Sequence, residues 1–196
     1  MQWHRLSVVA LLWLVCATAQ AVNIKGKEIP ETVSIGTPPA QLVLNGAGVR
    51  TKFFFSIYIG ALYVPKQHTD LRILESLPGY KRIVMNFIYD EVEAKKLADS
   101  WEEGFVKNQS PDVMQRLRPK LDEFKKLFPT VKNGDVIWID YIPDIGTQVS
   151  LNTKRLGGAI QGADFYRAVM HVWLGKEPAD SNLKQAMLGI TDDDEE

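Results

Sequence analysis

Hydrophobic and polar positions recur with two different periods along this chain. Apolar runs or alternating patterns, bounded by turn residues, predict strands near residues 24–29, 41–44, 52–63, 81–89, 135–142, 147–152 and 155–159. The last three strands are expected to form two hairpins, because residues 143–146 (PDIG) and 152–154 (NTK) supply turn chemistry between them.

Three other segments carry the helical period. The first helix is predicted after Asp90 as N-cap, with Glu93 completing a capping box and Trp101 on the apolar face. The second begins at Ser110 and Pro111, and Pro119 is expected to kink it or divide it.

A third helix is predicted from Asp164 to Gly175, where glycine and then Pro178 end the pattern. Strands and helices therefore come in separate groups along the chain. This order predicts an α+β fold, with an antiparallel sheet and helices packed on one face.

The two ends of the chain differ from the segment between them. Residues 1–21 combine one cation, Arg5, with an apolar core at 6–15 and an Ala19-Gln20-Ala21 end, as in a cleaved signal peptide. This predicts a periplasmic or secreted protein with one domain at 22–190, no membrane span in the mature chain, and an acidic disordered tail at 191–196. The single cysteine, Cys16, lies within the signal, so thiol chemistry and disulfides are excluded from the mature protein.

Charge and composition exclude several classes of function. The formal net charge is −1, and no basic stripe with interleaved aromatic residues indicates a nucleic-acid partner. His68 and His171 have no neighbours at ligand spacing, so no metal site is predicted. No Gly-x-Ser-x-Gly nucleophile elbow occurs. The sequence predicts no cofactor and leaves the oligomeric state open.

Arg50 is the first candidate for function. It lies between a glycine-rich segment (44–49), expected to be a turn, and an apolar strand, where an ionised group is costly unless it is paired or hydrated. Its guanidinium either reaches water, pairs with an internal carboxylate such as Asp140, or binds an anionic ligand. A dinucleotide fingerprint is rejected, because that motif needs a third glycine where the chain has Thr51.

Gly46, Gly48 and Arg50, followed by a phenylalanine-rich strand that closes on Gly60-x-x-Tyr63, resemble the signature of the chalcone isomerase-like family. The resemblance is to its secreted bacterial branch in particular. It continues at residues 101–105 (WEEGF), 134–135, 157–160, 164–165 and 173–178 (WLGKEP), and covers roughly residues 23–190. It implies an open-faced β-sandwich and chemistry without a cofactor.

The resemblance also implies what the arginine does. In chalcone isomerases it helps to activate a phenolate that adds to an enone, and in related plastid proteins it holds a fatty-acid carboxylate together with a tyrosine. The isomerase's strand threonine has Tyr58 as its nearest counterpart here, and residues 90–101 lack the isomerase's tyrosine and asparagine.

The leading hypothesis is therefore a periplasmic, non-catalytic binder of a fatty acid or similar amphiphilic carboxylate. Its ligand-binding residues are predicted to be Arg50, Tyr58, Tyr63 and Asn86, with Arg50 lacking a protein counter-charge in an apolar cleft; Asn86 alternatively faces solvent. One alternative is an intramolecular lyase acting on a chalcone-like phenolic enone, in which Arg50 is catalytic. A second is a structural or partner-binding protein without a ligand.

The strand after Arg50 is expected to supply part of the apolar cleft. By strict alternation Phe53, Phe55 and Ile57 share one face and Phe54 and Tyr58 the other; a bulge in this strand would exchange the faces. Most of these aromatic side chains are predicted to lie in the core.

Overall fold

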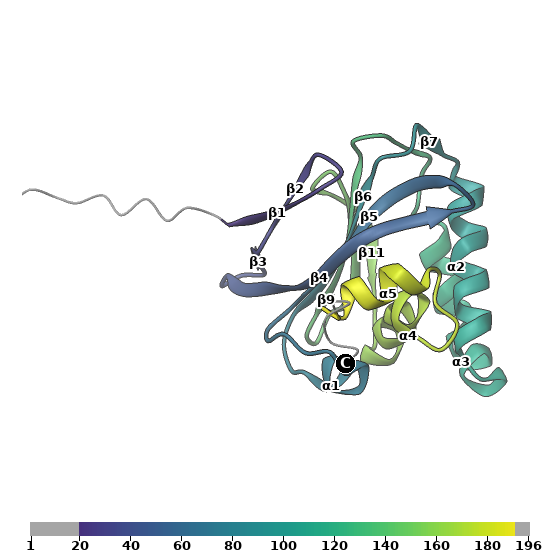
Figure 1. Ribbon diagram of the computed structural model, residues 1–196. Helices are drawn as coiled ribbons and strands as arrows, with labels where there is room; N and C mark the ends of the chain where they lie inside the picture. The colour runs from purple at the N-terminus through teal and green to yellow at the C-terminus, as the bar shows by residue number, and fades with distance from the viewer. Residues whose placement is uncertain (1–19, 191–196) are drawn as a thin grey trace, which may run out of the picture.

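The computed structural model describes residues 20–190 and shows a curled antiparallel sheet with helices on one face (Figure 1), as predicted. In spatial order, the seven strands of the main sheet are β11 (Lys154–Ile160), β10 (Gly146–Leu151), β9 (Val136–Ile142), β6 (Lys81–Phe87), β5 (Phe55–Val64), β4 (Ala40–Lys52) and β3 (Thr32–Ile35). Two smaller sheets pair β1 (Ala21–Ile24) with β2 (Lys27–Pro30) and β7 (Glu91–Val92) with β8 (Val131–Lys132).

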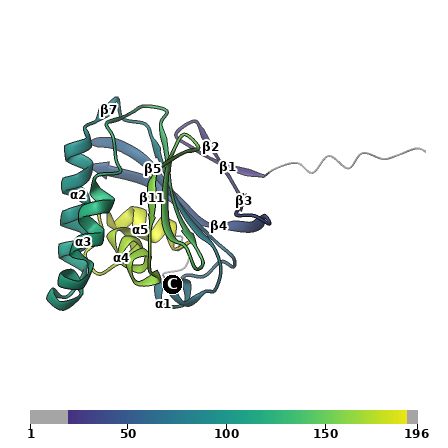
Figure 2. The ribbon, with the colours of Figure 1, turned by 180° about the vertical axis from the view of Figure 1, so that it is seen from behind.

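The helices of the described residues are α1 (Leu71–Ser76), α2 (Ala94–Asn108), α3 (Pro111–Lys125), α4 (Ala163–Leu174) and α5 (Ser181–Met187). α4 packs on β10, and α5 packs on β4 and β5. α2 contacts α3 and α4, so that α2 and α3 form an outer layer, as Figure 2 shows from behind. The main core lies between this helical layer and the sheet.

The other face of the sheet carries a second, smaller apolar cluster. It includes Leu44, Ile59 and Tyr63 from β4 and β5, and Ile29 from β2. The side chains of β5 therefore divide between two cores, with Leu62 and Tyr58 on the helix side. This division decides which residues of β5 are able to reach a site under the helices.

Several predicted boundaries are corrected by the structure. The strand predicted at 24–29 is a hairpin, because Lys25 and Gly26 turn the chain with φ of 51° and 76°. The segment 44–49 is not a turn but the middle of β4. α3 is one helix that contains Pro119, not two.

The start of α2 also differs from the prediction. Its N-cap is Glu93, which makes no side-chain capping bond, whereas Asp90 precedes the short strand β7. α1 and α5 were not predicted. Both are short, and both begin after an aspartate cap, Asp70 and Asp180 respectively.

The glycines of β4 lie where α5 crosses the strand. A Cβ atom on Gly46 would overlap the carbonyl oxygen of Ala186, and one on Gly48 would lie 2.6 Å from the Cβ of Ala186. Gly60 on β5 contacts Leu183 in the same way. These glycines therefore let α5 lie directly on the sheet, and this close packing positions Asp180, the N-cap of that helix.

A carboxylate joins the two outer helices. Glu102 of α2 accepts hydrogen bonds from Lys125 and Arg118 of α3, each at 2.6 Å. The Lys125 hydrogen bond is the largest cause of a lowered pKa at Glu102, and Arg118 adds to it.

The expected signal peptide and acidic tail fall mostly outside the described residues, since only 20–190 are described. β1 already begins at Ala21, the last residue of the expected signal. No helix within residues 20–190 has the length and apolar character needed to cross a membrane.

Candidate functional site

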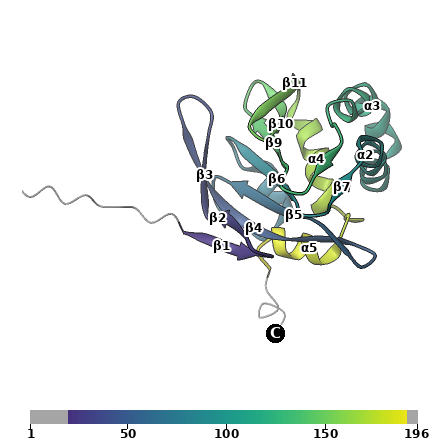
Figure 3. The same cartoon turned by 90° about the horizontal axis from the view of Figure 1, so that it is seen from above.

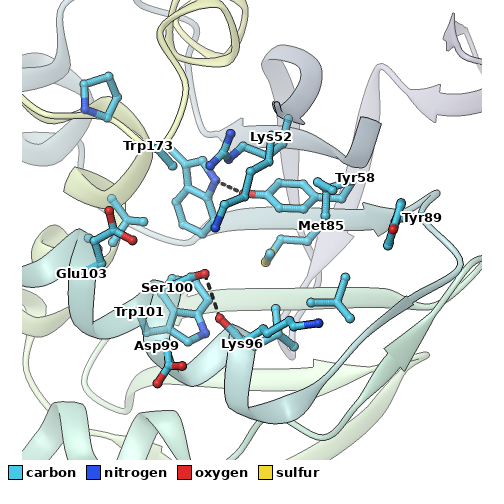
Figure 4. Close-up of a pocket in the computed structure, with 18 of the residues that line it drawn as sticks. Lys52, Tyr58, Met85, Tyr89, Lys96, Asp99, Ser100, Trp101, Glu103 and Trp173 are labelled. Carbon is cyan, nitrogen blue, oxygen red and sulfur yellow. Dashed lines mark hydrogen bonds between the residues drawn. The ribbon is translucent and has the colours of Figure 1, made fainter. Parts of the chain in front are cut away.

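A cavity of about 350 Å³ lies between the sheet and the helices (Figure 4). This volume is at the lower end of the range for small-molecule sites, about 300–1,000 Å³. Side chains of β5, β6, α2 and α4 supply its largely apolar walls, chiefly Ile57, Met85, Leu97, Trp101, Val172 and Trp173. Charged side chains from β4, α2 and the segment after α4 surround these walls.

Arg50 and Tyr58 lie opposite each other in the β4–β5 pair, and both line the cavity. Directly opposed residues of antiparallel strands project from the same face, which brings these two side chains together. The register shifts between Arg50 and Thr51. Because of this bulge, the neighbouring residues Ile57 and Tyr58 both reach the cavity, which strict alternation forbids.

The Tyr58 hydroxyl has an unused proton. It accepts a hydrogen bond of 2.8 Å from Nε1 of Trp173, and no oxygen or nitrogen of the described residues accepts its own hydrogen (Figure 4). Burial raises the pKa of Tyr58 to about 12, against the opposing effects of the Trp173 hydrogen bond and the nearby Arg50 charge. At neutral pH Tyr58 is therefore a protonated donor.

Arg50 does have a protein counter-charge, so the expectation of an unpaired guanidinium is wrong. Its Nη1 lies 3.6 Å from Oδ2 of Asp180, and it donates a hydrogen bond to the carbonyl of Thr51. Both side chains of this ion pair are largely buried, 19% and 12% exposed. The separation from Asp180 is longer than a hydrogen bond.

Asp180 is held in place by two backbone amides. Its Oδ2 accepts from the amide of Thr51 and its Oδ1 from the amide of Leu183, each at 3.0 Å. It therefore caps α5 and joins that helix to β4, beside Arg50. Asp140, the internal partner considered from the sequence, pairs instead with Arg82 through two hydrogen bonds of 2.6 and 2.7 Å.

Of the four residues predicted to bind a ligand, Tyr63 and Asn86 lie away from the cavity that Arg50 and Tyr58 line. Tyr63 is 2% exposed and belongs to the second cluster, where its hydroxyl donates to the carbonyl of Pro30 at 2.9 Å. Asn86 does not line the cavity, although its neighbour Met85 does. Both differ from Tyr58 for the same reason, because alternation along β5 and β6 places them on the other face.

The hairpin turn between β4 and β5 also differs from the prediction. Phe53, Phe54 and Phe55 are 83%, 97% and 56% exposed, so these aromatic side chains are not part of the core. His171 is only partly exposed, and its ring contacts Glu75 and Gln109.

No metal site is found in the part of the chain that the structure describes, where no three His, Cys, Asp or Glu side chains gather suitably. The sequence reasoning missed Lys52, Trp173 and Asp180 as cavity residues or direct neighbours of Arg50. For Asp180 a signal was present, since aspartate before a short amphipathic segment is a common N-cap. In the sequence, Trp173 stands out only as the first residue of the resembling segment 173–178 (WLGKEP).

A family model described as chalcone isomerase-like matches residues 21–189. Among solved structures, a fatty-acid binding protein from Arabidopsis thaliana superposes with a TM-score of 0.66 at 15% identity, covering 86% of this chain and 96% of that one. At this identity the similarity demonstrates a shared fold. No curated protein sequence matches the chain significantly.

Proposed function

This chain belongs to the chalcone isomerase-like family, and on that premise we propose that it is a non-catalytic binder of a fatty acid or similar amphiphilic carboxylate. The ligand's carboxylate lies at Arg50 and Tyr58, and its apolar chain lies along Ile57, Met85 and Leu97. The proposal also places the chain in the secreted bacterial branch and in the periplasm, on the strength of residues 1–21.

One observation carries the proposal. The Tyr58 hydroxyl accepts a hydrogen bond from Trp173, its own proton has no acceptor among the described residues, and it lies beside a guanidinium in a largely apolar cavity. A buried donor without an acceptor is costly, and a charge-assisted hydrogen bond is about twice as strong as a neutral one. The group that satisfies both donors is an oxyanion with an apolar remainder.

The charges around the site allow an anion despite Asp180. Arg50 and Lys52 both line the cavity, and Asp180 beside Arg50 and Glu177 at the cavity balance their two positive charges, so a ligand anion relies on direct contacts with Arg50 and Tyr58. Glu103, also at the cavity, is already paired with Lys107 at 2.6 Å.

The α2 wall supports binding over enone chemistry. Ser100 lines the cavity on this wall, and its hydroxyl donates to the carbonyl of Lys96 at 2.8 Å. That donor is already used. Residues 90–101 contain neither the tyrosine nor the asparagine of a chalcone isomerase; this wall does carry an indole donor, Nε1 of Trp101, which has no partner among the described residues.

The test is native mass spectrometry of gently purified protein, followed by titration with palmitate. We expect a bound acidic lipid in the wild type, and an affinity about ten- to a hundredfold weaker in Arg50→Ala, as for the loss of one charge-assisted contact. Arg72→Ala is the matched control, because it removes the same charge from an arginine side chain that is 89% exposed.

Two results would contradict the proposal. One is a wild-type protein that carries no lipid and ignores added fatty acids; the other is an Arg50→Ala variant that binds as tightly as Arg72→Ala. The same samples are mixed with chalcone, and we expect ring closure at the spontaneous rate. N-terminal sequencing of the protein recovered from the periplasm tests cleavage after residue 21.

A further inference from the structure

Three consecutive phenylalanines form the turn between β4 and β5, and all three are exposed. Phe54 is 97% exposed, Phe53 83% and Phe55 56%. Single exposed apolar side chains are normal on protein surfaces, but contiguous ones mark an interaction site. Elsewhere in residues 20–190 the large exposed apolar side chains, such as Val106 and Ile145, do not occur in runs.

The backbone of this turn does not favour phenylalanine. Phe53 has a φ of 56°, a left-handed conformation in which asparagine or glycine is much commoner than a bulky residue. The turn itself is defined by the flanking pairs Thr51–Ser56 and Lys52–Phe55. Neither packing in the core nor the backbone geometry of the turn requires aromatic side chains at these positions, which points to contact with an external partner.

The phenylalanine turn adjoins the opening of the cavity. Lys52, the residue before Phe53, lines the cavity. The ring of Phe55 packs edge-on against that of Tyr89, with 5.6 Å between the ring centroids. Tyr89 also lines the cavity. Figure 3 shows the turn projecting from the sheet beyond α5.

We propose that residues 53–55 insert into a lipid surface, so that the cavity opens next to the membrane from which an amphiphilic ligand enters. The insertion itself is independent of the proposed ligand, and only the transfer role rests on the proposed function. Lys52 and Tyr89 suit the boundary layer, since both combine an apolar body with a polar end.

Size and shape favour a lipid surface over a protein partner. Three phenylalanines bury at most about 450–750 Å², which is below the roughly 800 Å² that each partner contributes to a standard protein interface. A projecting turn also offers no complementary hollow for a second copy. Insertion into a bilayer requires only that the projecting side chains leave water.

The experiment is flotation of the purified protein with phosphatidylcholine vesicles, with and without phosphatidylglycerol, in 0.1 and 0.5 M NaCl. Wild type is compared with the double variant Phe53→Asn/Phe54→Ser, and Ile145→Ser serves as a matched control at another exposed turn. All samples share the same N-terminus, so residues 1–21 cannot account for a difference. We expect about a tenfold weaker partition constant for each phenylalanine replaced, and binding that persists at high salt.

A second readout places the turn in the bilayer directly. The tryptophan of Phe54→Trp is expected to be quenched by brominated phosphatidylcholine more strongly than the tryptophans of the wild type. Palmitate binding in vesicle-free solution is measured alongside. The double variant should retain the wild-type affinity for palmitate, whereas Arg50→Ala should bind it about ten- to a hundredfold more weakly and still float with vesicles. The two readouts therefore separate failure of one proposal from failure of the other.

Three outcomes would overturn the membrane proposal. They are a wild-type protein that does not float, a double variant that floats as well as Ile145→Ser, and self-association of the wild type in sedimentation velocity that the double variant abolishes. The last result would assign the turn to a contact between two copies.

Discussion

The close seating of α5 on β4 makes Gly46 the position at which a small change should have the largest effect. In Gly46→Ala the new methyl group overlaps the carbonyl oxygen of Ala186. That obstacle is backbone and cannot rotate away, so α5 must lift from the strand. Leu183 and Met187, which are both 0% exposed under this helix, then lose their packing.

The expected cost follows from those two side chains. Full burial stabilises a leucine or methionine by about 1.5–3 kcal/mol, so losing both contacts costs about 3–6 kcal/mol. Replacing glycine by alanine restricts the unfolded chain and returns about 0.4–1 kcal/mol. The free energy of unfolding should therefore fall by about 2–5 kcal/mol.

Urea unfolding followed by far-UV circular dichroism measures this change. Gly158→Ala is the control, because a Cβ there meets nothing within 4 Å, and its midpoint should stay close to that of the wild type. Fatty-acid affinity should also fall in Gly46→Ala, since lifting α5 moves Asp180 relative to Arg50. An unchanged urea midpoint in Gly46→Ala would refute the reasoning from the glycine contacts.

Three further predictions concern the site and its supports. Tyr58→Phe should weaken palmitate binding about tenfold or more, because the hydroxyl donor to the ligand is removed. It should also lower the free energy of unfolding by about 1–3 kcal/mol, because Nε1 of Trp173 loses its acceptor. An unchanged affinity in a titration would show that the hydroxyl does not contact the ligand. Asp140→Ala should lower the free energy of unfolding in urea by about 3–5 kcal/mol, because it leaves Arg82 buried without a partner. The double variant Arg82→Met/Asp140→Leu should recover most of that loss. Equal losses in the single and the double variant would contradict the prediction. The pKa of Glu102 is lowered below its ordinary 4.5, so the stability that its carboxylate contributes is present above pH 4.5 and lost as the pH falls through the lowered value. The difference in urea midpoint between wild type and Glu102→Gln should therefore shrink over that pH range. A difference that grows in acid would contradict the assigned direction of the pKa shift.

The sequence predicted most elements because their signals are local. Apolar alternation gave β6, β9 and β10, and the Ser110-Pro111 pair marked the start of α3. The errors also have local causes. A glycine-rich segment has the composition of a turn. Only the position of α5 shows that 44–49 is a strand in which Gly46 and Gly48 leave room for a helix.

The sequence by itself determined the fold class, through its two hydrophobic periods, and singled out Arg50, because a permanent charge beside an apolar strand needs a reason. Only the tertiary structure decided what surrounds that charge. Alternation along β5 places Tyr58 under the helices and Tyr63 on the opposite face, and a one-residue bulge in the pairing of β4 with β5 brings Ile57 into the cavity beside Tyr58. Asp180 lies 130 positions after Arg50 in the sequence, and only the packing of α5 on the sheet brings the two side chains together. No local sequence pattern encodes this ion pair.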